Sequence, residues 1–116
     1  MKTIRLAEVQ RSALDIDGAR DAAKQLVIGS DDGSPSFSMR VFTIAPGGHT
    51  PYHGHPFEHL NYVISGTGAL VDAQGQEHPI RAGDFALVLP GETHQYRNTA
   101  TEGNLVIICA VPRQYE

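Results

Sequence analysis

Apolar residues occur in this chain as short runs separated by glycine, proline and aspartate, and not at helical spacing. After residue 36 the strand-like segments span 37–44, 60–65, 69–72, 76–80, 85–89, 94–97 and 105–111, of which 76–80 and 94–97 are mainly polar. Runs of four to eight residues bounded by turn residues are typical of strands. Because no long helical pattern interrupts them, the sequence predicts an all-β fold of the sandwich or barrel type.

Three details refine this prediction. Residues 73–75, Ala-Gln-Gly, have hairpin composition and lie between two of the runs. Pro46-Gly47-Gly48 is expected to end the strand that begins at Phe37. The run 105–111 is apolar at every position, as expected for a strand buried on both faces.

The first 34 residues are less regular. Thr3 to Leu6 has the pattern of a short edge strand, and 6–10 equally that of one helical turn. Residues 19–24 have helical composition but lead directly into 25–29, a strand-like run. We favour a strand ending at Gly29.

Composition limits the function classes. The 116 residues are 41% hydrophobic and 19% charged, which indicates a single globular domain. The net charge is −4 with no basic patch, so nucleic acid and anionic membranes are not expected partners. One cysteine, Cys109, excludes an internal disulfide. We find no signal peptide or membrane-spanning segment, so a cytoplasmic location is expected.

Histidines provide the candidate chemistry. His53, His55 and His59 are separated by even numbers of residues, which places their side chains on one face of an extended chain. Neutral imidazole is the commonest side-chain metal ligand, so we expect these three and His94 to form one metal site inside the barrel. Glu58 is out of phase; it is a rival ligand to His59 or an acceptor for an imidazole N–H.

Three further residues are weaker candidates. Tyr96 lies two residues after His94 and would border the same cavity on a regular strand. His49 follows two glycines and is a minor candidate for the cavity mouth. His78, beside the hairpin at Gly75, is expected in solvent.

The histidines and glycines together resemble the two sequence motifs of the cupins, which are small double-stranded β-helices of jelly-roll type. For the first motif, Gly47 is followed after five residues by His53-Gly54-His55, and Gly66 closes it. The second motif corresponds to Gly83, Pro90, Gly91, His94 and Asn98, with the proline one residue later than usual. The resemblance implies a cupin barrel over 35–116 and an N-terminal arm over 1–34, packed on the barrel or on a partner subunit.

At the position of the glutamate in the first motif this chain has His59. The sequence therefore resembles small bacterial four-histidine cupins, which bind manganese. That resemblance implies a homodimer and redox activity. Cys109 lies in an apolar run, where a buried thiol is most often inert; the resemblance offers a place near the metal as the alternative. On this basis manganese is the expected ion, with iron, zinc, nickel and copper as alternatives that imidazole also suits.

Two function classes follow. One is a metal-dependent oxidoreductase or dioxygenase acting on a small organic substrate. With no carboxylate among the four ligands, redox or oxygen chemistry is favoured over hydrolysis, which generally needs a base beside the metal-bound water. The other is a non-catalytic, metal-containing module that binds or senses a small molecule. The fold alone does not decide between the two classes.

Overall fold

The computed structural model describes residues 1–116 as nine strands and three 3-10 helices. The strands span Ser12–Ala13 (β1), Arg20–Ile28 (β2), Phe37–His49 (β3), His59–Ser65 (β4), Thr67–Val71 (β5), Glu77–Arg81 (β6), Phe85–Val88 (β7), Gln95–Arg97 (β8) and Leu105–Pro112 (β9). The helices span Leu6–Glu8 (η1), Ser30–Asp32 (η2) and Arg113–Tyr115 (η3). None of them is long and apolar enough to cross a bilayer.

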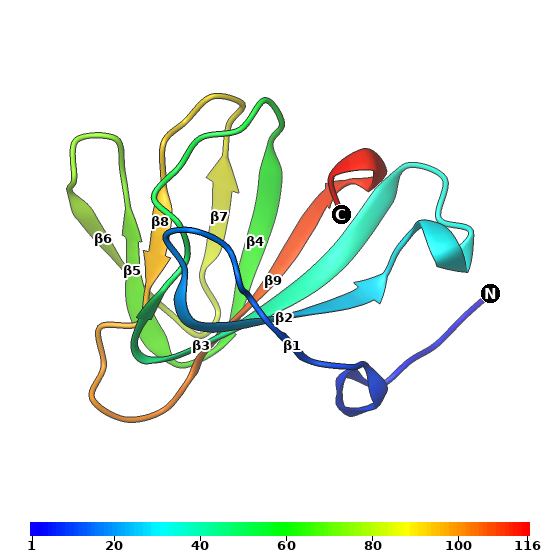
Figure 1. Ribbon diagram of the computed structural model, residues 1–116, viewed down its shortest axis with the longest axis horizontal. Coiled ribbons are helices and arrows are strands. Elements are labelled where there is room, and N and C mark those ends of the chain that lie inside the picture. The colour runs from blue at the N-terminus through cyan, green and yellow to red at the C-terminus, as the bar shows by residue number, and fades with distance from the viewer.

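Every strand pairing is antiparallel, in the order β6-β5-β8-β3-β9-β4-β7, with β2 added to β3 and β1 added to β2. The sheet curls so that β5, β6 and β8 stand at one side while the long strands β2, β3 and β9 run along the other (Figure 1). This arrangement confirms the predicted all-β, jelly-roll fold. The inner surface of the curl holds both the core and the candidate site.

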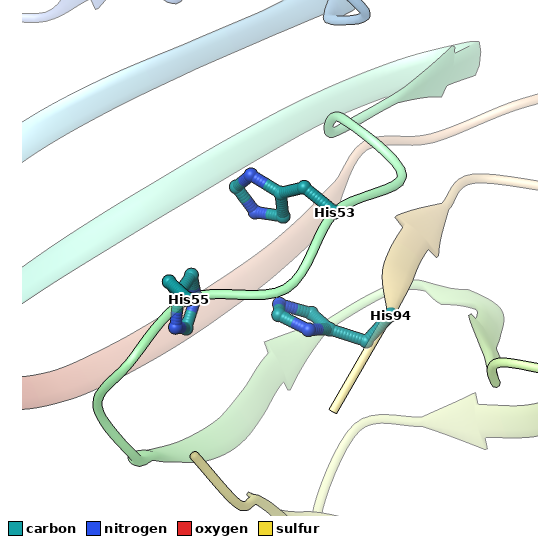
Figure 2. Close-up of side chains that lie close together, drawn as sticks. All are labelled: His53, His55 and His94. Carbon is teal, nitrogen blue, oxygen red and sulfur yellow. The ribbon is translucent and has the colours of Figure 1, made fainter. Parts of the chain in front are cut away.

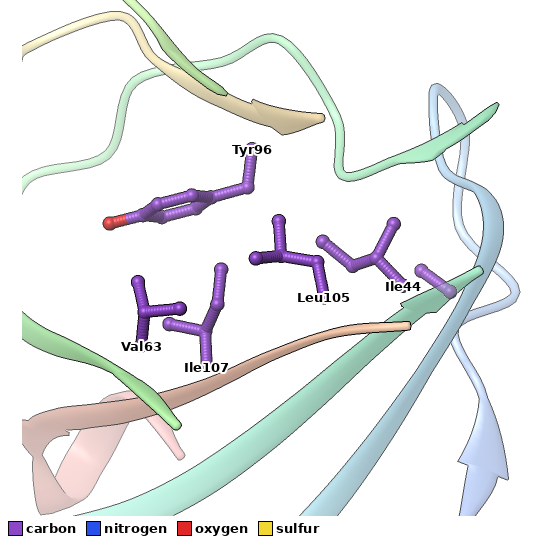
Figure 3. Close-up of a cluster of buried hydrophobic side chains, with 6 residues drawn as sticks. Ile44, Val63, Tyr96, Leu105 and Ile107 are labelled. Carbon is purple, nitrogen blue, oxygen red and sulfur yellow. The ribbon is translucent and has the colours of Figure 1, made fainter. Parts of the chain in front are cut away.

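A cluster of six buried side chains forms the core at one end of the curl: Ala22, Ile44, Val63, Tyr96, Leu105 and Ile107 (Figure 3). They come from β2, β3, β4, β8 and β9, so strands distant in sequence are joined by one apolar contact region. The prediction for 105–111 is corrected in part. One face of β9 is fully buried and the other only partly, because no second layer covers the outside of the sheet.

The expectation that Pro46-Gly47-Gly48 ends β3 is wrong, since the strand continues through these residues to His49. Its pairing with β2 skips from Ala22↔Ile44 to Arg20↔His49, which is a bulge that accommodates the extra residues. The Gly47 N–H donates to the Asn98 carbonyl, and the Asn98 N–H donates to the Gly48 carbonyl. The glycines therefore bend the strand toward β8 without ending it.

Two motif residues have structural roles. Gly66 has a φ of +86°, and a Cβ placed on it would lie 2.2 Å from the Asn104 carbonyl oxygen, so only glycine fits the turn between β4 and β5. The buried Asn98 amide donates to the carbonyls of Ile44 and Gly103, both at 2.9 Å. It thereby joins β3 to the loop before β9.

In the N-terminal region the structure has the helical alternative at η1 and a strand, not a helix, over residues 20–28. Strand β2 pairs with β3 of the same chain. The buried Gln25 amide donates to the carbonyls of Leu6 and Val9, both at 2.9 Å, which holds η1 against β2. The proposed division of the chain at residue 35 stays a prediction.

Candidate metal centre

The two cupin-like motifs meet at one backbone bridge. His53 and His94 exchange N–H···O bonds of 3.1 and 2.9 Å in an isolated antiparallel bridge. His55 lies in the loop that follows, and His59 begins β4. The expectation of one extended face is therefore corrected, because the chain bends at Pro56 and Phe57 between His55 and His59. The loop and two strand ends bring the four imidazoles together instead.

The four residues, called the histidine cluster below, lie close together. The ligand nitrogens of His53, His55 and His94 all lie within 4.8 Å of one another, and these rings surround a common space (Figure 2). The Nε2 atom of His59 is 3.1 Å from Nε2 of His94. Ring centroids are 4.9–5.2 Å apart for five of the six pairs. Only His53 and His59 have no ring contact, so they lie on opposite sides of the cluster.

Hydrogen bonds assign the tautomer of three rings. Nδ1 of His55 donates to the Phe57 carbonyl at 3.0 Å, and Nδ1 of His94 donates to the Glu92 carbonyl at 2.9 Å. Because a carbonyl oxygen can only accept, each Nδ1 carries the proton. Nε2 is therefore the nitrogen that each of these two rings can offer to a metal.

The third ring, His59, is fixed by an amide. Its Nδ1 is 2.6 Å from Oδ1 of Asn61, whose Nδ2 donates to the Ile108 carbonyl. That second bond orients the amide so that its oxygen faces the imidazole, and His59 is protonated at Nδ1. Two Nε2 lone pairs, of His59 and His94, then face each other at 3.1 Å with no proton between them. Such an arrangement is repulsive unless a cation lies nearby.

Burial keeps these rings neutral. Loss of solvent lowers the pKa of His59 to about 3, and the neighbouring imidazoles and Arg40 contribute in the same direction. Burial likewise lowers the pKa of His53 and of His94. At neutral pH His53, His59 and His94 therefore offer lone pairs, not positive charge. Neutral imidazoles with inward lone pairs are ligands for divalent transition metals, so the residues present fit such an ion.

The histidine cluster lines one part of a cavity of about 260 Å³ inside the curl. Apolar side chains such as Phe42 and Ile107 form much of its wall, and Tyr96 and Cys109 also line it. No aspartate or glutamate is among its lining residues. The cavity therefore combines potential metal ligands with a compact, largely apolar space.

Glu58 does not take either role expected of it. Its side chain is exposed and outside the cavity lining, and the hydrogen bonds from the imidazoles go to main-chain carbonyls and to Asn61 instead. The reason is that Glu58 precedes the first residue of β4 and so points away from the side taken by His59. His49 also lies outside the cavity lining, and His78 pairs with Asp72 at the surface.

Sequence reasoning missed several cavity residues, among them Lys24, Arg40 and Asn61. Asn61 had a usable signal, since it is two residues after His59 and therefore on the same face of β4. Arg40 and Lys24 had weaker signals, because a single cation in an apolar strand usually reaches solvent. Their inward direction depends on how β2, β3 and β9 curl together.

Comparison with known proteins gives the family. The Cupin domain model matches residues 40–111, which include both motifs and the histidine cluster. The chain belongs to the cupin family. None of the curated proteins is significantly similar to it.

Solved structures similar to this cupin agree with its fold. The polyketide cyclase RemF from Streptomyces resistomycificus is 26% identical, with a TM-score of 0.90 over 97% of this chain and 79% of that one. A predicted oxalate decarboxylase from Thermotoga maritima is 20% identical, with a TM-score of 0.84 over 97% and 99% of the two chains. KdgF from a Halomonas species is 15% identical, with a TM-score of 0.77 over 97% and 94%. The last two likenesses concern the fold alone.

Single substitutions test which residues hold a metal. We expect His53→Ala, His55→Ala, His59→Ala and His94→Ala each to weaken metal binding by at least about tenfold, because even residues that only orient a ligand contribute 10- to 100-fold. Glu58→Ala is the matched control and should retain its metal. Metal content is measured by elemental analysis of untagged protein after dialysis. Loss of metal from Glu58→Ala together with full retention by His59→Ala would reverse the assignment.

Proposed function

We propose that this cupin is a metal-dependent enzyme, an oxidoreductase or dioxygenase, that acts on a small organic molecule at a centre held by His53, His55, His59 and His94. The observation that carries the proposal is the close approach of imidazole Nε2 atoms at the wall of the cavity. The cavity of about 260 Å³ is below the roughly 300–1,000 Å³ typical of sites for drug-sized ligands. The substrate is therefore small.

Manganese is the proposed ion, with iron, zinc, nickel and copper as alternatives. When bound, a divalent metal supplies a Lewis acid and, for manganese, iron or copper, a redox centre. Imidazole ligands accept all five ions, and affinity alone favours copper, nickel and zinc. Manganese therefore rests on the resemblance of the His-Pro-Phe-Glu-His run at 55–59 to four-histidine cupins.

The arrangement of the imidazoles supports an ion with room for substrate. In a regular tetrahedron all six ligand pairs are equivalent, whereas here His53 and His59 lie apart and the other five pairs are in contact. Four imidazoles arranged in this way would hold a bound ion without enclosing it on every side. We infer that the open side faces the cavity.

The chain's own residues favour redox chemistry over hydrolysis. The cavity lining contains no carboxylate that could act as a general base. Burial raises the pKa of Tyr96 further above its ordinary value, so its phenol stays protonated and acts as a hydrogen-bond donor. The apolar wall limits water in the cavity.

Turnover tests the proposal. Protein loaded with manganese, iron, copper or zinc is assayed for oxygen- or peroxide-dependent conversion of small phenolic, unsaturated and thiol compounds, with His53→Ala as the control. We expect at least one redox-active loading to exceed the control by about 100-fold or more, since positioned electrostatic groups contribute at that scale. If no loading exceeds His53→Ala, the enzyme proposal fails and a non-catalytic binding or sensing module takes its place.

A second candidate reaction is a metal-assisted cyclisation without net redox change. It is favoured by the likeness to the polyketide cyclase RemF, at 26% identity over 97% of this chain. Zinc separates the two candidates, because zinc has no redox chemistry. Turnover supported equally by zinc and manganese favours the cyclisation, whereas turnover restricted to redox-active ions favours the oxidoreductase.

We also propose that the protein is a homodimer. We propose a cytoplasmic location, because a chain with one cysteine has none of the internal disulfides typical of secreted proteins. The outer face of β4 and β7 exposes Leu60, Phe85 and Leu87, with exposed fractions of 57%, 81% and 54%. Together with Tyr62 and Ile108 they form an apolar hollow, and neighbouring apolar side chains of this kind mark interaction sites. A second copy of the chain is the proposed occupant.

Light scattering tests the dimer. At micromolar concentration we expect twice the chain mass for the wild type and one chain mass for Phe85→Lys, because a charge in an apolar contact is strongly unfavourable. Leu26→Lys on β2 is the matched control and should stay dimeric. A monomeric wild type contradicts the proposal. A monomeric Leu26→Lys with dimeric Phe85→Lys would instead place the contact on the N-terminal segment.

A further inference from the structure

The wall of the cavity contains two cations, Lys24 of β2 and Arg40 of β3. Both are half-buried; Arg40 forms no ion pair with a carboxylate, whereas the charge of Glu116 acts on Lys24. Buried charges are normally paired, because their removal from water is costly. An unpaired guanidinium on the wall of a cavity free of aspartate and glutamate is therefore unusual.

Arg40 is held in place by weak partners. Its Nη2 is 3.0 Å from Sγ of Cys109, which lies opposite it on β9, and its guanidinium carbon is 5.1 Å from the centre of the Phe42 ring. A thiol is a poor acceptor, and the buried Nε–H has no partner. The guanidinium is thus positioned while most of its charge stays uncompensated.

Tyr96 supplies a second observation. Its side chain is 5% exposed, and its hydroxyl is buried without a hydrogen-bond partner. Figure 3 shows that hydroxyl at the end of the core cluster opposite Ile44. Tyr96 and Arg40 line the same cavity. A buried hydroxyl with no partner loses free energy relative to water, so a ligand oxygen that accepts from it would restore the missing bond.

Lys24 adds to the positive potential without being the main contact. Its Nζ donates to the main-chain oxygen of Glu116 at 3.0 Å. Burial, and then the charge of Arg40, lower the pKa of Lys24, while the charge of Glu116 raises it. Glu116 therefore offsets part of the repulsion between the two cations. An anion between them would relieve that repulsion.

We propose that Arg40 and Tyr96 form a subsite for the carboxylate of a small organic acid, next to the histidine cluster. A guanidinium binds a carboxylate through charge-assisted N–H···O bonds, and the Tyr96 hydroxyl donates to the same ligand. Phe42, Ile44 and Ile107 give the cavity an apolar wall for the rest of the molecule. This subsite gives the substrate class of the proposed enzyme, a small organic acid. Binding of the acid does not depend on the proposed function, but its assignment as the substrate does.

The test measures binding to chelator-treated protein, so that no metal competes for the anion. The probes are 4-fluorobenzoate and its neutral counterpart 4-fluorobenzamide, each titrated by ¹⁹F NMR. We expect the carboxylate to bind at least about tenfold more tightly than the amide, as one charge-assisted hydrogen bond provides. Equal affinities for the two probes would overturn the proposal.

Matched substitutions assign the binding to residues. Arg40→Gln should abolish the preference for the carboxylate, and Arg97→Gln, which removes the same charge on the exposed side of β8, should not. Tyr96→Phe should weaken 4-fluorobenzoate binding about three- to tenfold without lowering thermal stability, because its hydroxyl has no partner to lose. Tyr52→Phe, at an exposed position outside the cavity lining, is its control.

The remaining outcomes are decisive as well. A folded Arg40→Gln that keeps the preference overturns the proposal. If Arg40→Gln does not fold, unchanged 4-fluorobenzoate binding to Tyr96→Phe overturns it instead. Binding seen only after metal loading makes the anion a metal ligand and refutes the subsite, while the proposed enzyme stands. Preference in the metal-free protein, with no turnover by any loaded form, supports the subsite and refutes the enzyme.

Discussion

The approach of two imidazole nitrogens, Nε2 of His59 and Nε2 of His94, at 3.1 Å is the constraint on which the candidate site depends. The Nδ1 atom of His59 is hydrogen-bonded to Asn61, and that of His94 to the Glu92 carbonyl. Neither ring can therefore turn its Nε2 lone pair away without losing a hydrogen bond. The backbone bridge between His53 and His94 fixes the loop of the first motif next to His94. A cation bound by both lone pairs would replace this repulsion with attraction.

The curl of the sheet explains why one small domain can hold both a core and a cavity. Along the inner face of β9, Leu105 and Ile107 belong to the core, and Cys109 lies against Arg40 at the cavity wall. Tyr96 joins the two regions, since its ring packs in the core and its hydroxyl has no partner. The same strands therefore supply stability at one end and unsatisfied polar groups at the other, as functional sites commonly require.

Much of the fold was accessible from the sequence because it depends on local signals. Strand runs and glycine turns predicted the all-β fold, and motif spacing selected His53, His55, His59 and His94. What failed was geometry that depends on distant residues. The bulge that lets β3 continue to His49 forms only against β2. Glu58 looked suitable by composition, but the bend before β4 turns it to solvent. The inward direction of Arg40 follows from its pairing opposite Cys109, which no local pattern records.

The central claim is that all four imidazoles share one cation, and anomalous diffraction from crystals of manganese-loaded protein tests it most directly. The account predicts one anomalous peak within about 2.0–2.4 Å of the Nε2 atoms of His53, His55, His59 and His94, slightly longer than the distances seen for zinc. It also predicts that no protein carboxylate coordinates the ion. A peak bound by three histidines with His59 outside, or by Glu58 in its place, would contradict the account.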